Sequence, residues 1–140
     1  MIPDAHKVVA DHVRTYPSVS TLQARVVNKT PDTLDKPWVR VSLLDAPSNG
    51  VPDYLIAALV QFDCYAAKDG QQNDGAPGAM RLALAVRESL TGDDDGIARA
   101  THADAVVSGA RINSFGELPD SEMEPARARV VITSTIWLHR

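Results

Sequence analysis

The segment 54–90 constrains the fold most, because the spacing of its apolar side chains changes once from a strand period to a helix period. Residues 54–65 read YLIAALVQFDCY, and their second half alternates between two faces, as the side chains of a strand do. Residues 76–90 repeat apolar side chains three and four positions apart, which predicts an amphipathic helix. The polar, glycine-containing residues 66–78 predict a loop. The expected core is therefore a buried strand followed by a helix that folds back over the sheet.

The rest of the chain shows the same two periods. Residues 126–140 carry the longest alternation, which predicts a long final strand with one buried and one polar face. A helix is predicted from Pro3 to Arg14, because Pro suits the first helical turn and Pro17 disfavours helical dihedrals in the residue before it. Further strands are predicted at 22–28, 37–44 and 103–114, with a bulge or close packing at Gly109 and a turn at 115–125.

These elements predict a single α+β domain spanning residues 1–140. The expected sheet is mostly antiparallel but mixed, with about four to five strands, two main helices packed on one face and a long C-terminal strand. A chain of 140 residues with 44% apolar residues is long enough for one packed core and too short for two comfortable domains.

The charge and the apolar runs exclude some classes of protein. The net charge of −4 argues against a protein whose main task is to wrap nucleic acid. The longest apolar run, 55–60, is too short to span a bilayer, and the N-terminus lacks the pattern of a signal peptide. We therefore expect a soluble protein that is made in the cytoplasm and does not bind membranes.

Motifs of catalysis and metal binding are missing from the sequence. Cys64 is the single cysteine, so no internal disulfide is expected, and its strand position predicts a small core residue. His6 and His12 are six residues apart and fall on different sides of the predicted helix, so they do not form a pair of metal ligands. The sequence predicts no catalytic residue, metal or cofactor, although a site assembled from distant residues stays an alternative.

Arginine and tryptophan share the polar faces of two predicted strands. One interpretation is a solvated surface whose long side chains cover apolar area. The other is a protein interface, since Trp and Arg are enriched at the centres of interfaces. The residues concerned are Trp38, Arg40, Arg127, Arg129 and Trp137.

The layout of the chain resembles the tail terminator (tail completion) proteins of long-tailed bacteriophages. The resemblance rests on the order of four pieces: the strand YLIAALVQFDCYA, the helix GAMRLALAVRESL, the Leu118-Pro119-Asp120 turn and the final strand PARARVVITSTIWLHR. It implies a small α+β structural subunit without enzymatic activity that assembles as a hexameric ring. Such a ring caps the tail tube, stops its polymerisation and joins the tail to the head connector.

The resemblance also implies partners and a location. The partners would be other copies of the chain, the tail tube protein and the head–tail connector or stopper, in a virion assembled in the host cytoplasm. DNA would pass through the ring without specific binding, and the acids Asp69 and Asp74 suit such a lumen because like charges repel. The loop 66–78 and the outward side chains Arg127, Arg129 and Trp137 are the expected contacts with neighbouring subunits or the tube.

Two alternatives stay open at this point. A different neck component, either a head–tail connector or a stopper protein, would also be a small, acidic ring-forming chain. A small α+β ligand-binding domain or enzyme would instead require a deep pocket with converging polar groups.

Overall fold

The described part of the chain forms three helices and six strands. It comprises residues 5–29, 36–45, 56–66, 75–92, 96–102, 105–118 and 128–139 of a computed structural model. The elements are α1 (Ala5–Thr15), α2 (Pro17–Ser20), β1 (Arg25–Val27), β2 (Trp38–Asp45), β3 (Ile56–Tyr65), α3 (Gly75–Thr91), β4 (Thr101–His102), β5 (Ala105–Glu117) and β6 (Arg129–His139). This order confirms the predicted α+β class and the long C-terminal strand.

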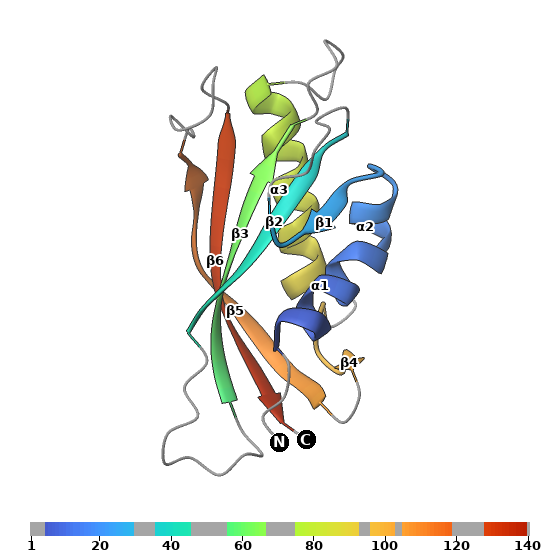
Figure 1. Ribbon diagram of the computed structural model, residues 1–140, viewed down its shortest axis with the longest axis vertical. Coiled ribbons are helices and arrows are strands. Elements are labelled where there is room, and N and C mark those ends of the chain that lie inside the picture. Colours follow the sequence, from blue (N-terminus) through green and yellow to red (C-terminus); the bar gives the residue numbers. More distant parts are fainter. Residues whose placement is uncertain are drawn as a thin grey trace.

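The strands form one mixed sheet in the order β1-β2-β3-β6-β5-β4. Only the β1–β2 pair is parallel among the described strands, and the other neighbours are antiparallel. β6 lies between β3 and β5 (Figure 1), and its side chains alternate between buried and half-buried along its whole length. The strongest alternation in the sequence therefore occupies an inner position, where one face of each residue meets the core.

All three helices cover the same face of the sheet (Figure 1). Val8 and Val13 of α1 and Leu82 of α3 are fully buried there, together with Phe62 of β3 and Ile132 of β6. Two histidines of α1 add polar contacts: His6 Nε2 donates to the carbonyl of Val41 at 3.1 Å, and His12 Nε2 donates to the carbonyl of Ser89 at 2.7 Å. The two imidazoles therefore bind different elements, as their spacing predicts.

Some predicted boundaries were wrong. Residues 115–117 belong to β5 and not to a turn, because Phe115 pairs with Ile132 and packs against the core. The helix α2 follows Pro17, and the strand predicted at 22–28 is reduced to β1. The interruption expected at Gly109 is confirmed as a register shift between Val107 and Gly109.

Candidate functional site

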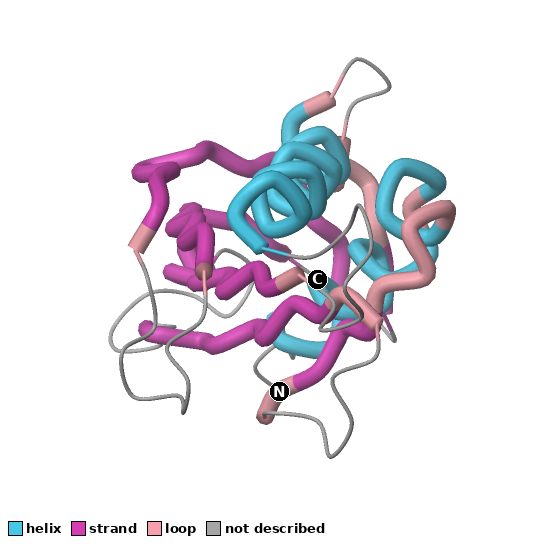
Figure 2. The backbone as a smooth tube through the Cα atoms, turned by 90° about the horizontal axis from the view of Figure 1, so that it is seen from above, coloured by secondary structure: helices cyan, strands magenta, loops and turns pink. Residues whose placement is uncertain are grey.

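The face of the sheet opposite the helices, here called the open face, is the surface most suited to a function. No described helix packs against it, and Figure 2 shows the helices gathered on the other side. Since cross-strand partners project to the same side, the strand registers define its members. They are Trp38, Arg40 and Ser42 of β2; Ala57, Leu59, Gln61, Asp63 and Tyr65 of β3; Gly109, Arg111, Ser114 and Gly116 of β5; and Arg129, Val131, Thr133, Thr135 and Trp137 of β6.

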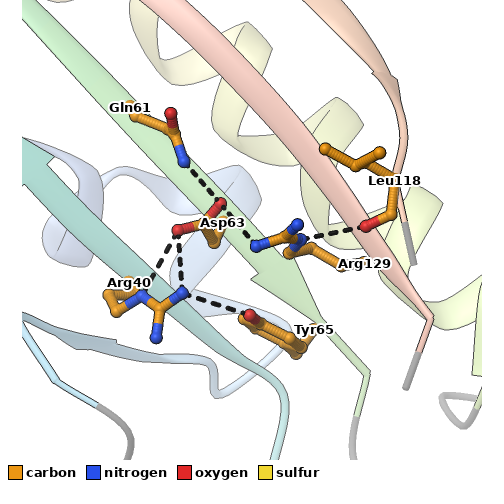
Figure 3. Close-up of polar contacts among 6 residues, drawn as sticks. All are labelled: Arg40, Gln61, Asp63, Tyr65, Leu118 and Arg129. Carbon is orange, nitrogen blue, oxygen red and sulfur yellow. Dashed lines mark hydrogen bonds and ion pairs between the residues drawn. The ribbon is translucent and has the colours of Figure 1, made fainter. Parts of the chain in front are cut away.

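A buried carboxylate lies at one end of the open face. Asp63 is 1% exposed, and its Oδ2 accepts from Arg40 Nε at 3.3 Å and Arg40 Nη2 at 3.2 Å. Its Oδ1 accepts from Gln61 Nε2 at 3.0 Å and lies 3.7 Å from Arg129 Nη1 (Figure 3). Asp63 thus has cationic partners from the strands on both sides of its own, as a buried charge requires.

Strand register explains how these groups meet. Arg40 is the cross-strand partner of Asp63, and Arg129 is the partner of Tyr65. Arg40 Nη2 also donates to Tyr65 Oη at 3.3 Å, and Arg129 Nε donates to the carbonyl of Leu118 at 2.9 Å. The cluster therefore links β2, β3, β6 and the end of β5.

The cluster carries excess positive charge. Two guanidinium groups flank the single carboxylate of Asp63, and both remain partly exposed, with side-chain exposures of 27% for Arg40 and 17% for Arg129. Farther along the face, Arg111 lies over the ring of Trp137, 5.8 Å from its centroid, and donates to Asn113 Oδ1 at 3.1 Å. The open face thus carries three arginines and one aspartate.

The structure separates the predicted site residues into three groups. Arg40 and Arg129 meet at Asp63, and Trp137 lies half-buried beside Arg111. The prediction that Trp38 faces outward was wrong. Its side chain is fully buried and stacks on Tyr65, with ring centroids 3.9 Å apart. Arg127, Asp69 and Asp74 lie outside the described residues, as does most of the loop 66–78.

Sequence reasoning missed Asp63, Gln61 and Arg111 as members of the site. The alternation of β3 did place Asp63 and Gln61 on the polar face. Their partners, however, depend on the register between strands, and no local pattern encodes it.

Burial shifts the pKa of one cysteine and one histidine among the described residues. Cys64 is fully buried, which confirms the predicted core position. Burial, with a smaller contribution from the charge of Asp63, raises the pKa of its thiol, so it is a poor nucleophile. Burial also lowers the pKa of His12, although its hydrogen bond to Ser89 opposes that shift.

Other candidate sites are weak in the part of the chain that the structure describes. No group of three or more His, Cys, Asp or Glu side chains gathers there to hold a metal ion. A depression on α3 is lined by Leu84, Arg87, Glu88, Thr91 and Gly92, and its two charged side chains are exposed. No described helix is long and apolar enough to cross a membrane.

A comparison with models of known protein families finds no match to this chain, and a comparison with curated proteins finds none either. The functional argument therefore depends on the open face, on the fold and on the resemblance in layout described above.

Proposed function

We propose that this chain is a structural virion protein, a bacteriophage tail terminator whose copies form a ring on the head-proximal end of the tail tube. The ring, hexameric by resemblance, stops tube polymerisation and presents the surface that joins the tail to the head connector. Its partners are other copies of the chain, the tube protein and the connector or stopper. The acids Asp69 and Asp74 stay assigned to a lumen through which DNA passes without specific binding.

The open face is the observation that carries this proposal. It is a sheet surface that carries three arginines, several small and polar side chains and the half-buried Trp137, with no described helix over it, while the other face packs against the helices. A subunit in a ring needs a surface for its neighbour that is separate from its own core. The α+β order and the long final strand agree with the resemblance.

Electron microscopy of purified protein mixed with tail tubes tests the proposal. We expect density that caps one end of each tube, and we expect tube growth to stop once the protein is added to polymerising subunits. Tubes incubated with an unrelated acidic protein of similar size are the control. Uncapped tubes that continue to grow would contradict the proposal.

A second arm of the experiment separates the terminator from the neck alternatives. Mixed with isolated head connectors in the absence of tubes, a terminator should stay unbound, or bind only after it has capped a tube. Binding to connectors without any affinity for tubes would assign the chain to the connector or stopper class instead.

A further inference from the structure

The outer edge of β5 is only partly covered. β4 pairs with Ala105 and Val106, and the backbone of Arg99 and Ala100 binds Val107. From there to the end of the strand, residues 108–117 have no strand on this side among the described residues, and most of them are exposed. The unpaired N–H and C=O groups of such a free edge are a template for a strand from another chain.

β2 has a second free edge on the other side of the sheet. The parallel strand β1 covers only residues 38–40, and His6 Nε2 binds the carbonyl of Val41. Residues 42–45 have no outer neighbour in the described part of the chain, although Leu43 and Leu44 are 42% and 50% exposed there. Exposed leucines in an edge strand favour association, and proteins that stay monomeric usually place charges or prolines at such edges.

The directions of the two edge strands suit pairing between copies. The pairs β2–β3, β3–β6 and β6–β5 are all antiparallel, so β2 and β5 run in opposite directions. A second copy that is related to the first by rotation about an axis along the strands therefore brings its β2 antiparallel to β5. Antiparallel pairing is slightly more stable per residue than parallel pairing.

The registers within one sheet also indicate which residues would meet. Three rows of cross-strand partners run from β2 to β5: Ser42, Gln61, Thr133 and Ser114; Leu43, Val60, Ser134 and Ile112; and Asp45, Leu59, Thr135 and Arg111. A copy that is rotated without a shift along the strands sets its Ser42 opposite Ser114. Its Leu43 then meets Ile112, so that apolar side chains pair across the two edges. Its Asp45 meets the exposed Arg111, so the two positions carry opposite charges.

We infer that neighbouring copies join their sheets edge to edge, with the free edge of β2 in one copy added antiparallel to the free edge of β5 in the next. Leu43 packs on Ile112 at the centre of this seam, and Asp45 lies opposite Arg111 at one end of it. Arg111 in turn lies over Trp137, 5.8 Å from its centroid, so the seam adjoins the open face. Because the two edges differ, the contact is heterologous, which is the kind that closes into rings; closure into a ring rests on the proposed function.

A disulfide across the seam tests the inference. In the full chain, Ser42→Cys and Ser114→Cys are small changes in one row of partners, and they bring two thiols together only between copies. Within one chain, two strands separate β2 from β5, a distance of about 14 Å, whereas a disulfide needs Cα atoms within about 7 Å. The native Cys64 does not compete, because it is fully buried and burial raises the pKa of its thiol.

The expected products are specific to the two edges. Oxidised with copper phenanthroline, with and without tail tubes, the double variant should form a ladder of covalent oligomers on a non-reducing gel. Each single variant should stay monomeric, and peptide mass spectrometry should find the linkage between positions 42 and 114. No ladder under either condition would overturn the inference. Dimers of Ser114→Cys alone would overturn it too, because they would pair β5 with β5 of the second copy.

Edge variants give an independent measure of the contact. Leu43→Lys places a charge on the free edge of β2 and should weaken self-association about 10-fold or more, measured by sedimentation velocity. Leu84→Lys on α3 is the matched control, since Leu84 is 43% exposed and Leu43 is 42% exposed, and it should change association less than about 2-fold. Arg111→Glu should weaken association as well, and adding Asp45→Arg should restore it. Equal effects of the two lysine variants would contradict the inference.

The proposed function and this inference fail in different ways. A protein that caps tail tubes without the linkage between positions 42 and 114 keeps the function and loses the inference. A linked ladder without capping keeps the inference and removes the function.

Discussion

At the scale of single residues, burial and not distance determines how much the fold is destabilised when an ion pair loses one partner. The bridge between Arg14 and Asp11 is short, at 2.9 Å, but both side chains are about half exposed. Asp63 lies 3.2 Å from Arg40 and 3.7 Å from Arg129, yet it has almost no contact with solvent. Water screens the first pair and hardly reaches the second carboxylate, so removing one partner should cost more at Asp63 than at the exposed pair.

Asp63→Asn should therefore destabilise the chain far more than Asp11→Asn. Loss of the buried carboxylate leaves Arg40 and Arg129 without their common counter-ion, which should lower the free energy of unfolding by about 2–3 kcal/mol. Asp11→Asn, the same change at an exposed pair, should cost less than about 0.5 kcal/mol. Urea unfolding followed by circular dichroism measures both. Equal losses would mean that the network around Asp63 contributes no more than a surface bridge.

His12 should make stability depend on pH in a defined direction. Burial lowers its pKa below the usual 6.5, so the unfolded chain binds the proton more readily than the folded one. This contribution to stability is then complete above about pH 6.5 and declines as the pH falls through that value towards the lower pKa of the folded state. We expect the melting temperature to drop between about pH 7.5 and 5.5.

The control is His12→Gln, which keeps a donor for the Ser89 carbonyl but cannot titrate in this range. Its melting temperature should depend on pH less steeply than that of the wild type. Parallel curves for the two proteins would show that His12 does not cause the decline.

At the scale of elements, the spacing of apolar residues predicted the long helix and the long strand. It did not predict features that depend on contacts between elements. β6 and α3 follow from long, regular patterns, and the structure places both within one or two residues of the predicted positions where they are described. The four-residue helix α2 has too few side chains to show a period. In the candidate site, Arg40 and Arg129 were correctly assigned to a polar face, but Trp38 on that same face is fully buried and stacks on Tyr65. Alternation predicts which face of the sheet a side chain lies on, but not how deeply that side chain is buried.

Gly96 packs against the last turn of α3 in a conformation that the sequence did not predict. Gly96 has a φ of +55°, and a Cβ there would collide with the carbonyl oxygen of Leu90. That oxygen accepts from the Ile97 amide at 3.1 Å, which holds Gly96 and Ile97 against the last turn of the helix. Gly96→Ala should destabilise by more than about 1 kcal/mol, because both the dihedral and the close approach exclude a side chain.

Gly116→Ala in β5 is the matched control, since a Cβ at that position has open space around it. It should change stability by less than about 0.5 kcal/mol, and alanine reduces the conformational freedom of the unfolded chain. Thermal unfolding of the two variants measures the difference in their stability. A Gly96→Ala variant as stable as Gly116→Ala would refute the role assigned to Gly96.

At the scale of the whole molecule, the two faces of the sheet have different tasks. The helix face is closed by apolar packing from α1 and α3, and the side chains of Phe62, Ile132 and Ile136 are fully buried there. On the open face the buried Asp63 is paired with Arg40 and Arg129, and the exposed Arg111 lies beside the half-buried Trp137. A change on the open face should therefore affect association between molecules more than the stability of one molecule.

The variant Trp137→Ala tests whether the open face serves association and not the stability of one molecule. Trp137 is half-buried on the open face, flanked by its cross-strand partners Ala57 and Gly109 and covered in part by Arg111. Large aromatic side chains with small neighbours are typical anchors of interfaces, so its truncation should weaken self-association about 10-fold or more, measured by sedimentation. Leu84→Ala on α3, where the leucine is 43% exposed, removes an exposed apolar side chain from the opposite layer and should leave association unchanged. Because the far-ultraviolet spectrum of both variants should match the wild type, unchanged assembly in Trp137→Ala would mean that the contact between copies lies elsewhere.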